Sequence, residues 1–114
     1  MYPERRRSPR VPLDEQLSGR VEVLGVELLI RNVSFGGFLA ESNHEFIERE
    51  VVPVRLSLRD GSWSEVFDSR VISCRERRVP DESAYLVGFA FAGAESWDPR
   101  VHMLMDRLVA NFGS

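Results

Sequence analysis

The chain has 114 residues, 43% of them hydrophobic, and a formal net charge of −3, which suits one acidic domain and excludes the broad basic face that a nucleic acid polymer needs. A single cysteine excludes an internal disulfide, and neither a signal peptide nor an apolar run of about 18 residues is evident, so we expect a cytoplasmic protein without membrane contact. The charge is uneven, because residues 1–10 hold four arginines and one acid, and the remainder carries −6.

Residues 1–12 are predicted to form a flexible arm. They contain three prolines and four arginines but almost nothing apolar, so ordering them alone costs more entropy than it returns. All 15 basic residues of the chain are arginine, whose planar guanidinium grips phosphates and the O6/N7 edge of guanine. Arg6 and Arg10 face the same side of an extended chain, roughly 13 Å apart. Taken alone, a cluster of arginines at a terminus is also typical of a solvated arm that binds no ligand.

Residues 17–91 show short stretches of apolar and polar alternation separated by turn signals. The turn signals are Gly25, Gly36-Gly37 and Asp60-Gly61, and the predicted polar or charged loops are residues 42–50 and 75–83. The predicted strands are residues 17–24, 26–33, 38–41, 52–58, 65–74 and 84–91. Short strands with frequent turns indicate a β-barrel or a β-sandwich.

Residues 98–112 are predicted to form an amphipathic helix. Asp98 is a capping side chain, Pro99 suits the first helical position, and Gly113 marks the end. Apolar side chains recur at helical spacing, at Val101, Leu104, Met105, Leu108, Val109 and Phe112. This face is expected to pack on the strands, and a contact between two copies of the chain is the alternative.

Several other residues have ordinary structural explanations. Trp63, beside a turn, could stack on a guanine, although a half-buried loop aromatic is the simpler interpretation. Cys74 is expected to be a small buried side chain. His44 and His102 lie far apart without a third ligand at metal spacing, so no metal site is predicted. No acid pair, nucleophile elbow or phosphate-loop motif is present, so neither catalytic residues nor an enzyme activity is predicted.

A second polar cluster ends the strand of residues 26–33. Asn32 and Ser34 are two residues apart and face one side, and their amide and hydroxyl groups both donate and accept hydrogen bonds, as a base edge requires. Gly37, preceded by Gly36, permits a positive φ and a close approach of ligand to backbone. On its own, this segment is also an ordinary hairpin turn.

Together, the two segments resemble the PilZ domain family. An Arg-x-x-x-Arg pair in an N-terminal arm is followed, about 20 residues later, by Asn-x-Ser-x-x-Gly at the first hairpin. The segment of residues 85–91 looks like the last barrel strand of that family, and a helix after this strand is common there. The resemblance implies a six-stranded antiparallel β-barrel that binds cyclic di-GMP, with residues 1–12 as a ligand-clamping arm and residues 13–114 as the barrel and its helix.

The resemblance also implies which residues bind the ligand. The arm arginines wrap over cyclic di-GMP, and the hairpin motif contacts a guanine from the barrel surface. In the family, an arginine just before the first motif arginine tends to go with a stacked pair of ligands, and Arg5 holds that place here, so two ligands per chain are expected. The expected contacts are Arg5, Arg6, Arg10, Asn32, Ser34 and Gly37, with Arg7, Gly36 and Trp63 as possible additions.

The expected function is therefore that of a cyclic di-GMP receptor, monomeric or weakly dimeric, that needs no other cofactor. Ordering of the arm on binding is expected to relay the signal to a separate, unidentified effector protein, because the chain has no output domain of its own. A PilZ-like adaptor that works without the ligand is the alternative. A single-stranded nucleic acid binder is disfavoured by the acidic body.

Overall fold

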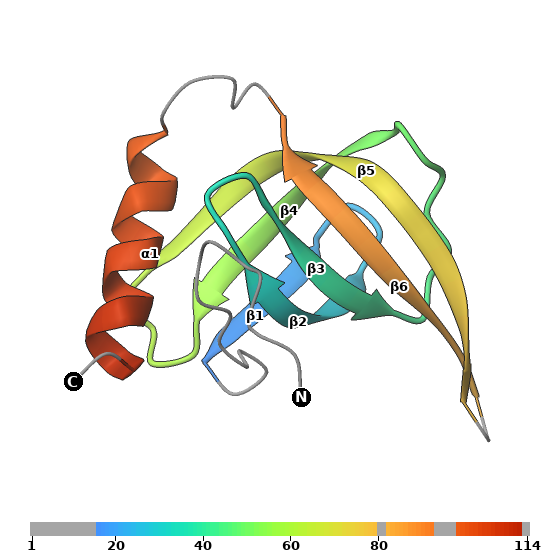
Figure 1. The fold of residues 1–114 in the computed structure, drawn as a ribbon, viewed down its shortest axis with the longest axis horizontal. Helices are drawn as coiled ribbons and strands as arrows, with labels where there is room; N and C mark the ends of the chain where they lie inside the picture. Colours follow the sequence, from blue (N-terminus) through green and yellow to red (C-terminus); the bar gives the residue numbers. More distant parts are fainter. Residues whose placement is uncertain (1–15, 80–81, 93–97, 113–114) are drawn as a thin grey trace, which may run out of the picture.

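The strands of the chain close into an antiparallel barrel, and one helix packs beside it (Figure 1). The computed structural model describes residues 16–79, 82–92 and 98–112, so the predicted arm lies outside the described residues. The elements are β1 (Leu17–Val21), β2 (Val26–Val33), β3 (Gly37–Ser42), β4 (Val51–Leu58), β5 (Ser64–Val79), β6 (Glu82–Phe91) and α1 (Pro99–Phe112). The strand order around the barrel is β1-β2-β3-β6-β5-β4. Of the two predicted architectures, the barrel is correct.

Alternation of apolar and polar residues explains why most strands form where they were predicted. In β4, every second side chain is buried in the barrel interior, namely Val52, Val54, Leu56 and Leu58. The strand predicted at residues 17–24 stops earlier, at Val21, because a turn follows in which Gly25 has a φ of 68°. Glycine adopts this left-handed conformation without steric cost.

The predicted charged loop at residues 75–83 is wrong. β5 continues to Val79 and β6 begins at Glu82, and the two strands stay paired along this whole stretch, with Arg75 opposite Leu86 and Arg77 opposite Ala84. This end of the hairpin extends away from the barrel in Figure 1. The side chains of Arg75, Glu76 and Arg77 are exposed, so this part of β5 shows no apolar alternation from which a strand could be predicted.

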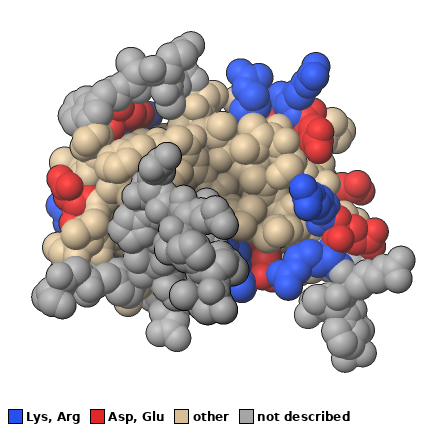
Figure 2. Space-filling view, in the orientation of Figure 1, with Lys and Arg blue, Asp and Glu red and all other residues tan. Residues whose placement is uncertain are grey.

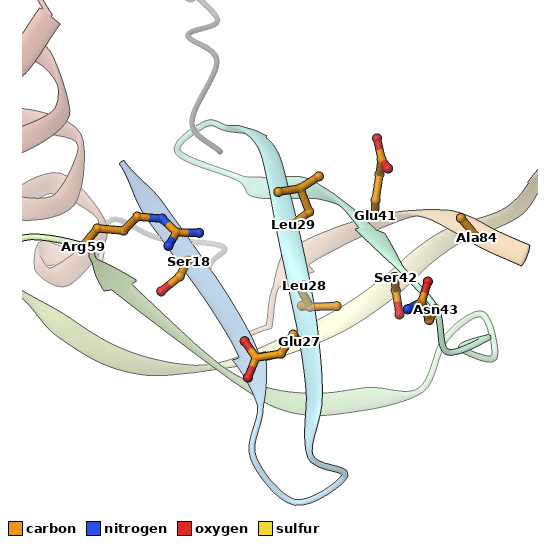
Figure 3. Close-up of a pocket in the computed structure, with 9 residues that line it drawn as sticks. All are labelled: Ser18, Glu27, Leu28, Leu29, Glu41, Ser42, Asn43, Arg59 and Ala84. Atoms are coloured by element: carbon orange, nitrogen blue, oxygen red, sulfur yellow. The ribbon is translucent and has the colours of Figure 1, made fainter. Parts of the chain in front are cut away.

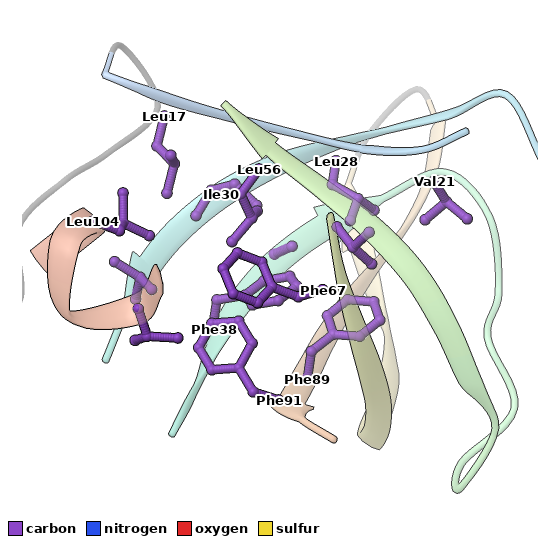
Figure 4. Packing of buried hydrophobic residues seen from close by; sticks show 14 of the residues in the cluster. Leu17, Val21, Leu28, Ile30, Phe38, Leu56, Phe67, Phe89, Phe91 and Leu104 are labelled. Atoms are coloured by element: carbon purple, nitrogen blue, oxygen red, sulfur yellow. The ribbon is translucent and has the colours of Figure 1, made fainter. Parts of the chain in front are cut away.

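Phenylalanine side chains fill the barrel interior (Figure 4). The rings of Phe38 and Phe89 stack with their centroids 4.8 Å apart, and those of Phe67 and Phe91 lie 4.9 Å apart. Leu104 of α1 is fully buried against this cluster. A ligand as large as a dinucleotide must therefore bind on the outer surface of the barrel.

Trp63 belongs to this core rather than to a loop surface. Its side chain is 6% exposed, and its ring lies 6.1 Å from that of Phe67. Trp63 does lie in the loop between β4 and β5, as expected, but the expected half burial of its side chain is wrong. A side chain this buried does not support a stacking contact between Trp63 and a guanine. Cys74 packs against the core, but its side chain is only partly buried rather than buried as expected.

Helix α1 begins where its capping signal predicts. Asp98 accepts a hydrogen bond from the backbone N–H of Arg100 at 2.9 Å. The inward face buries Val101, Leu104 and Leu108 in the core. Val109, which was predicted on this apolar face, is instead 58% exposed. The helix thus covers the barrel with a narrower apolar stripe than its sequence indicates.

The pairing of Asp98 with Arg100 makes this helix start sensitive to acid. The hydrogen bond from the Arg100 side chain, aided by backbone N–H groups, lowers the pKa of the Asp98 carboxyl below its ordinary value of 3.8. A carboxyl with a depressed folded-state pKa stabilises the fold above its unfolded pKa and loses that contribution as the pH falls through the folded value. We expect Asp98→Asn to lower the melting temperature at pH 7, and we expect that difference to shrink as the pH falls below 3.8 toward the lowered folded-state pKa. A difference that stays constant across this pH range in thermal melts would contradict the assignment.

Candidate ligand-binding site

A pocket of about 410 Å³ lies on the outer face of the barrel where β2, β3, β5 and β6 meet. One side is formed by the hairpin motif, with Asn32, Ser34, Gly36 and Gly37. The remaining lining residues come from the neighbouring strands and include Leu39, Ile72, Ser73, Gly88 and Ala90. We call this depression the motif pocket. The structure therefore brings together the candidate residues that the sequence places in the hairpin.

Two β-bulges turn polar side chains toward the motif pocket. In β2 the register shifts between Ile30 and Asn32, and in β5 it shifts between Val71 and Ser73. Since Ile30 and Val71 point into the core, strict alternation would also bury Asn32 and Ser73. The extra residue at each bulge reverses the alternation, so both polar groups line the outer face.

Small residues form the floor of the motif pocket. Asn32 is paired with Leu39, Leu39 with Gly88, and Gly88 with Ser73, so these four lie in one row across the sheet. A Cβ at Gly88 would lie 2.8 Å from the Ser73 hydroxyl oxygen and 3.3 Å from Cγ1 of Ile72. The bare backbone of Gly88 thus leaves a low, flat floor edged by an aliphatic side chain, which suits a planar ring.

Backbone hydrogen bonds fix the motif hairpin. The Ser34 N–H donates to the Gly37 carbonyl at 2.8 Å, and its hydroxyl makes a longer bond of 3.4 Å to the same oxygen. The Gly36 carbonyl accepts a hydrogen bond from the Phe91 N–H of β6 at 2.9 Å. The hairpin tip is therefore held on both its own strand pair and the neighbouring strand.

Gly37 is required for a reason other than the one its sequence context indicates. The only glycines with a positive φ among the described residues are Gly25 and Gly61, so Gly37 does not use the positive φ that a glycine permits. Instead, a Cβ at Gly37 would overlap the carbonyl oxygen of Phe89 and lie 2.9 Å from Cα of Ala90. Glycine is needed here because β3 and β6 approach each other closely.

The motif pocket itself provides hydrogen-bonding groups but no charge, since none of the described residues that line it is ionisable. Arg31, next to Asn32 in the chain, forms an ion pair with Glu41 at 3.0 Å, and Arg77 pairs with the same carboxylate at 2.6 Å. In Figure 2 the middle of the visible face, where grey atoms do not cover it, is mostly uncharged, and charged side chains lie around its edges, most of them on the right. An anionic ligand in the motif pocket would need cations from another part of the chain.

A second pocket, of about 360 Å³, lies on the outer face of β1, β2 and β3 (Figure 3). Its lining includes Glu27 and Glu41 on one side and Arg59 near Ser18 on the other. Both acids already have arginine partners: Glu27 forms an ion pair with Arg20, and Glu41 forms ion pairs with Arg31 and Arg77. Two carboxylates in the lining disfavour an anionic ligand, and none of the predicted contacts that the structure describes lines this pocket.

The other predicted contacts cannot be placed. Arg5, Arg6, Arg7 and Arg10 lie outside the described residues and stay predictions. The residues that sequence reasoning missed are those of β5 and β6, because a β-bulge leaves no mark in the residue pattern. Gly88 did carry a signal, since a glycine inside a strand often marks a close approach of ligand or backbone.

Comparison with known proteins supplies the family. Within the described part of the chain, no group of three potential metal ligands lies together, and no helix is long and apolar enough to cross a membrane. Searches of curated proteins and of solved structures gave no match. The family model described as the PilZ domain matches residues 4–105, which span both the arm and the motif pocket. The chain therefore belongs to the PilZ domain family, the family of cyclic di-GMP receptors.

Proposed function

We propose that this protein binds cyclic di-GMP in the motif pocket, clamps it with the N-terminal arginine arm, and relays the signal to a separate effector protein. The observation that carries the proposal is the register of β1 against β2. Ser18 pairs with Leu29 in antiparallel orientation, so the beginning of β1 lies beside the end of β2 that leads to Asn32. This placement supports an arm that starts next to the motif pocket.

The distance that the arm must span supports this arrangement. Arg10 lies six residues before Gln16, the first described residue, and Arg6 lies four residues further away. An extended chain spans at most about 3.5 Å per residue, so Arg10 can reach about 20 Å from Gln16 and Arg6 about 35 Å. Both distances are ample for side chains that close over a ligand seated beside Asn32.

The chemistry of the two parts is complementary. The motif pocket offers the amide of Asn32, the hydroxyl of Ser34 and a low floor, which suit the edge and face of a guanine. The arm offers guanidinium groups, which grip phosphates with paired hydrogen bonds and stack on bases. Cyclic di-GMP carries two guanines and two phosphates, so each part of the protein meets the ligand groups that it fits. Closure of the arm creates a new surface for the effector to recognise.

The Ser34 hydroxyl is expected to contribute directly to binding. Ser34→Ala should weaken the affinity for cyclic di-GMP about two- to tenfold, the loss expected for one hydrogen bond, with little change in melting temperature. Ser18→Ala is the matched control, because the Ser18 hydroxyl also makes a bond of 3.4 Å to a backbone carbonyl, that of Ser57, but lies in the other pocket. Calorimetric titrations that give equal affinities for both variants would remove Ser34 from the site.

The number of bound ligands is expected to depend on Arg5. Two stacked ligands place four phosphates and four guanines in a small volume, and a guanidinium at position 5 offsets the repulsion and stacks on an outer guanine. We expect two ligands per chain for the wild type and one for Arg5→Leu. Arg107→Leu, which removes the same charge from an exposed position on α1, should keep two. A wild-type titration that saturates at one ligand per chain would refute the role of Arg5 and leave the receptor function intact.

A further inference from the structure

One aromatic contact joins the motif hairpin to helix α1. Phe35 sits at the hairpin tip between two residues that line the motif pocket, Ser34 and Gly36. Its ring lies 4.7 Å from that of His102 on α1, centroid to centroid, at an interplanar angle of 44°. Because Phe35 is 49% exposed, this contact is not part of the barrel core.

The helix side of the contact is firmly held. The Arg100 guanidinium donates a hydrogen bond to the Val66 carbonyl of β5 at 2.9 Å and lies 4.4 Å above the ring of Phe67. Val101, next along the helix, is 2% exposed in the core. His102 follows these two anchored residues directly, so the first turn of α1 presents its ring from a fixed position.

On the other side of the contact lies the motif hairpin, whose geometry determines the shape of the motif pocket. The backbone bonds described above hold Ser34 to Gly37 and Gly36 to Phe91, and Phe35 lies between the two anchored residues. A displacement of the Phe35 backbone therefore also displaces Ser34 or Gly36, both of which line the motif pocket, and the contact of the Phe35 ring with His102 resists that displacement. The position of Phe35 and the shape of the pocket are linked.

We infer that Phe35 and His102 form a positioning contact, through which α1 holds the motif hairpin in the geometry that binds the ligand. The inference rests on the proposed function for its effect on affinity, but the positioning itself exists without ligand. Because coupling between two sites is reciprocal, ligand binding in turn strengthens the docking of α1. The first turn of the helix thus becomes a part of the molecule that responds to the ligand.

The ligand-free test is amide hydrogen exchange at Ser34, whose N–H is bonded to Gly37. Phe35→Ala and His102→Ala should each speed this exchange about two- to tenfold, the effect expected from loss of an aromatic pair. His102→Phe keeps a ring in place and should restore the wild-type rate. Met103→Ala, on the next residue of α1, removes a side chain that is 50% exposed and should change nothing. Unchanged exchange at Ser34 in both alanine variants would overturn the inference, whatever the ligand does.

The second test measures affinity and α1 protection with cyclic di-GMP. Phe35→Ala and His102→Ala should each weaken binding about two- to tenfold, and the double variant should be no weaker than the weaker single variant. Ligand should slow amide exchange in the first turn of α1 in the wild type but not in His102→Ala. Wild-type affinity in both alanine variants would overturn the inference alone, whereas absence of binding to the wild type would instead overturn the proposed function.

Discussion

Replacing Gly37 with alanine is expected to lower the free energy of unfolding by about 3 kcal/mol and to remove cyclic di-GMP binding. The new Cβ would overlap the Phe89 carbonyl oxygen and crowd Cα of Ala90. Both obstacles are backbone atoms of β6, which cannot rotate away as a side chain can. To accommodate the methyl group, β3 and β6 must move apart at the floor of the motif pocket, so stability and binding should fall together.

The neighbouring glycine is the control for this prediction. A Cβ at Gly36 would meet no atom within 4 Å, and Gly36 does not have a positive φ. Gly36→Ala should therefore melt close to the wild type, whereas Gly37→Ala should melt about 10 °C lower. Thermal melts followed by circular dichroism provide the comparison. Equal melting temperatures for the two variants would mean that the close approach of β3 and β6 does not set the requirement for glycine.

Arg6→Ala and Arg10→Ala are each expected to weaken cyclic di-GMP binding about 10- to 100-fold, because each removes a charge-assisted contact of about 1.5–3 kcal/mol. The described residues that line the motif pocket supply no charge to replace the lost guanidinium. The melting temperature without ligand should not change, since the arm is predicted from its composition to lie outside the hydrophobic core. Calorimetric titrations of both variants measure the effect.

A control variant must show that the loss of affinity comes from the position of the arginine in the arm and not from the loss of one positive charge. Arg107→Ala removes one positive charge from the exposed side of α1, and Arg107 does not line the motif pocket. It should bind like the wild type at moderate ionic strength, because distant exposed charges are screened. If Arg6→Ala and Arg10→Ala both retain wild-type affinity, the arm is not the clamp, and the phosphates must be held by other groups.

Strands and the helix could be predicted from the sequence where the spacing of apolar residues follows which side chains are buried. Alternation in β4 and the capping signal of α1 gave elements close to those observed. The extension of the β5–β6 hairpin was missed because the side chains of Arg75, Glu76 and Arg77 are exposed and show no apolar alternation. The burial of Trp63 was underestimated because only its neighbouring turn was considered, and not its packing on Phe67. Closure of the strands into a barrel came from the family resemblance, since pairing between distant strands leaves no local pattern.

The candidate site likewise contains some residues that could be predicted from the sequence and others that could not. The hairpin motif could be found because Asn32 and Ser34 are polar groups at strand spacing before a glycine pair. The role of Gly37 was misjudged, because the backbone of β6 that requires a glycine there is distant in sequence. Ser73 was missed because the bulge that turns it outward depends on pairing with β6. The Phe35 contact with His102 likewise depends on the packing of α1.

A calorimetric titration of the wild-type protein with cyclic di-GMP tests the central claim most directly, with GMP as the control ligand. The account predicts a saturable heat of binding for cyclic di-GMP in the micromolar range or below, and weak or no binding for GMP, which lacks the second guanine and the bridging phosphates. Saturation also gives the number of ligands per chain. A flat titration, with a folded protein and an intact arm, would contradict the receptor function and favour a PilZ adaptor that works without the ligand.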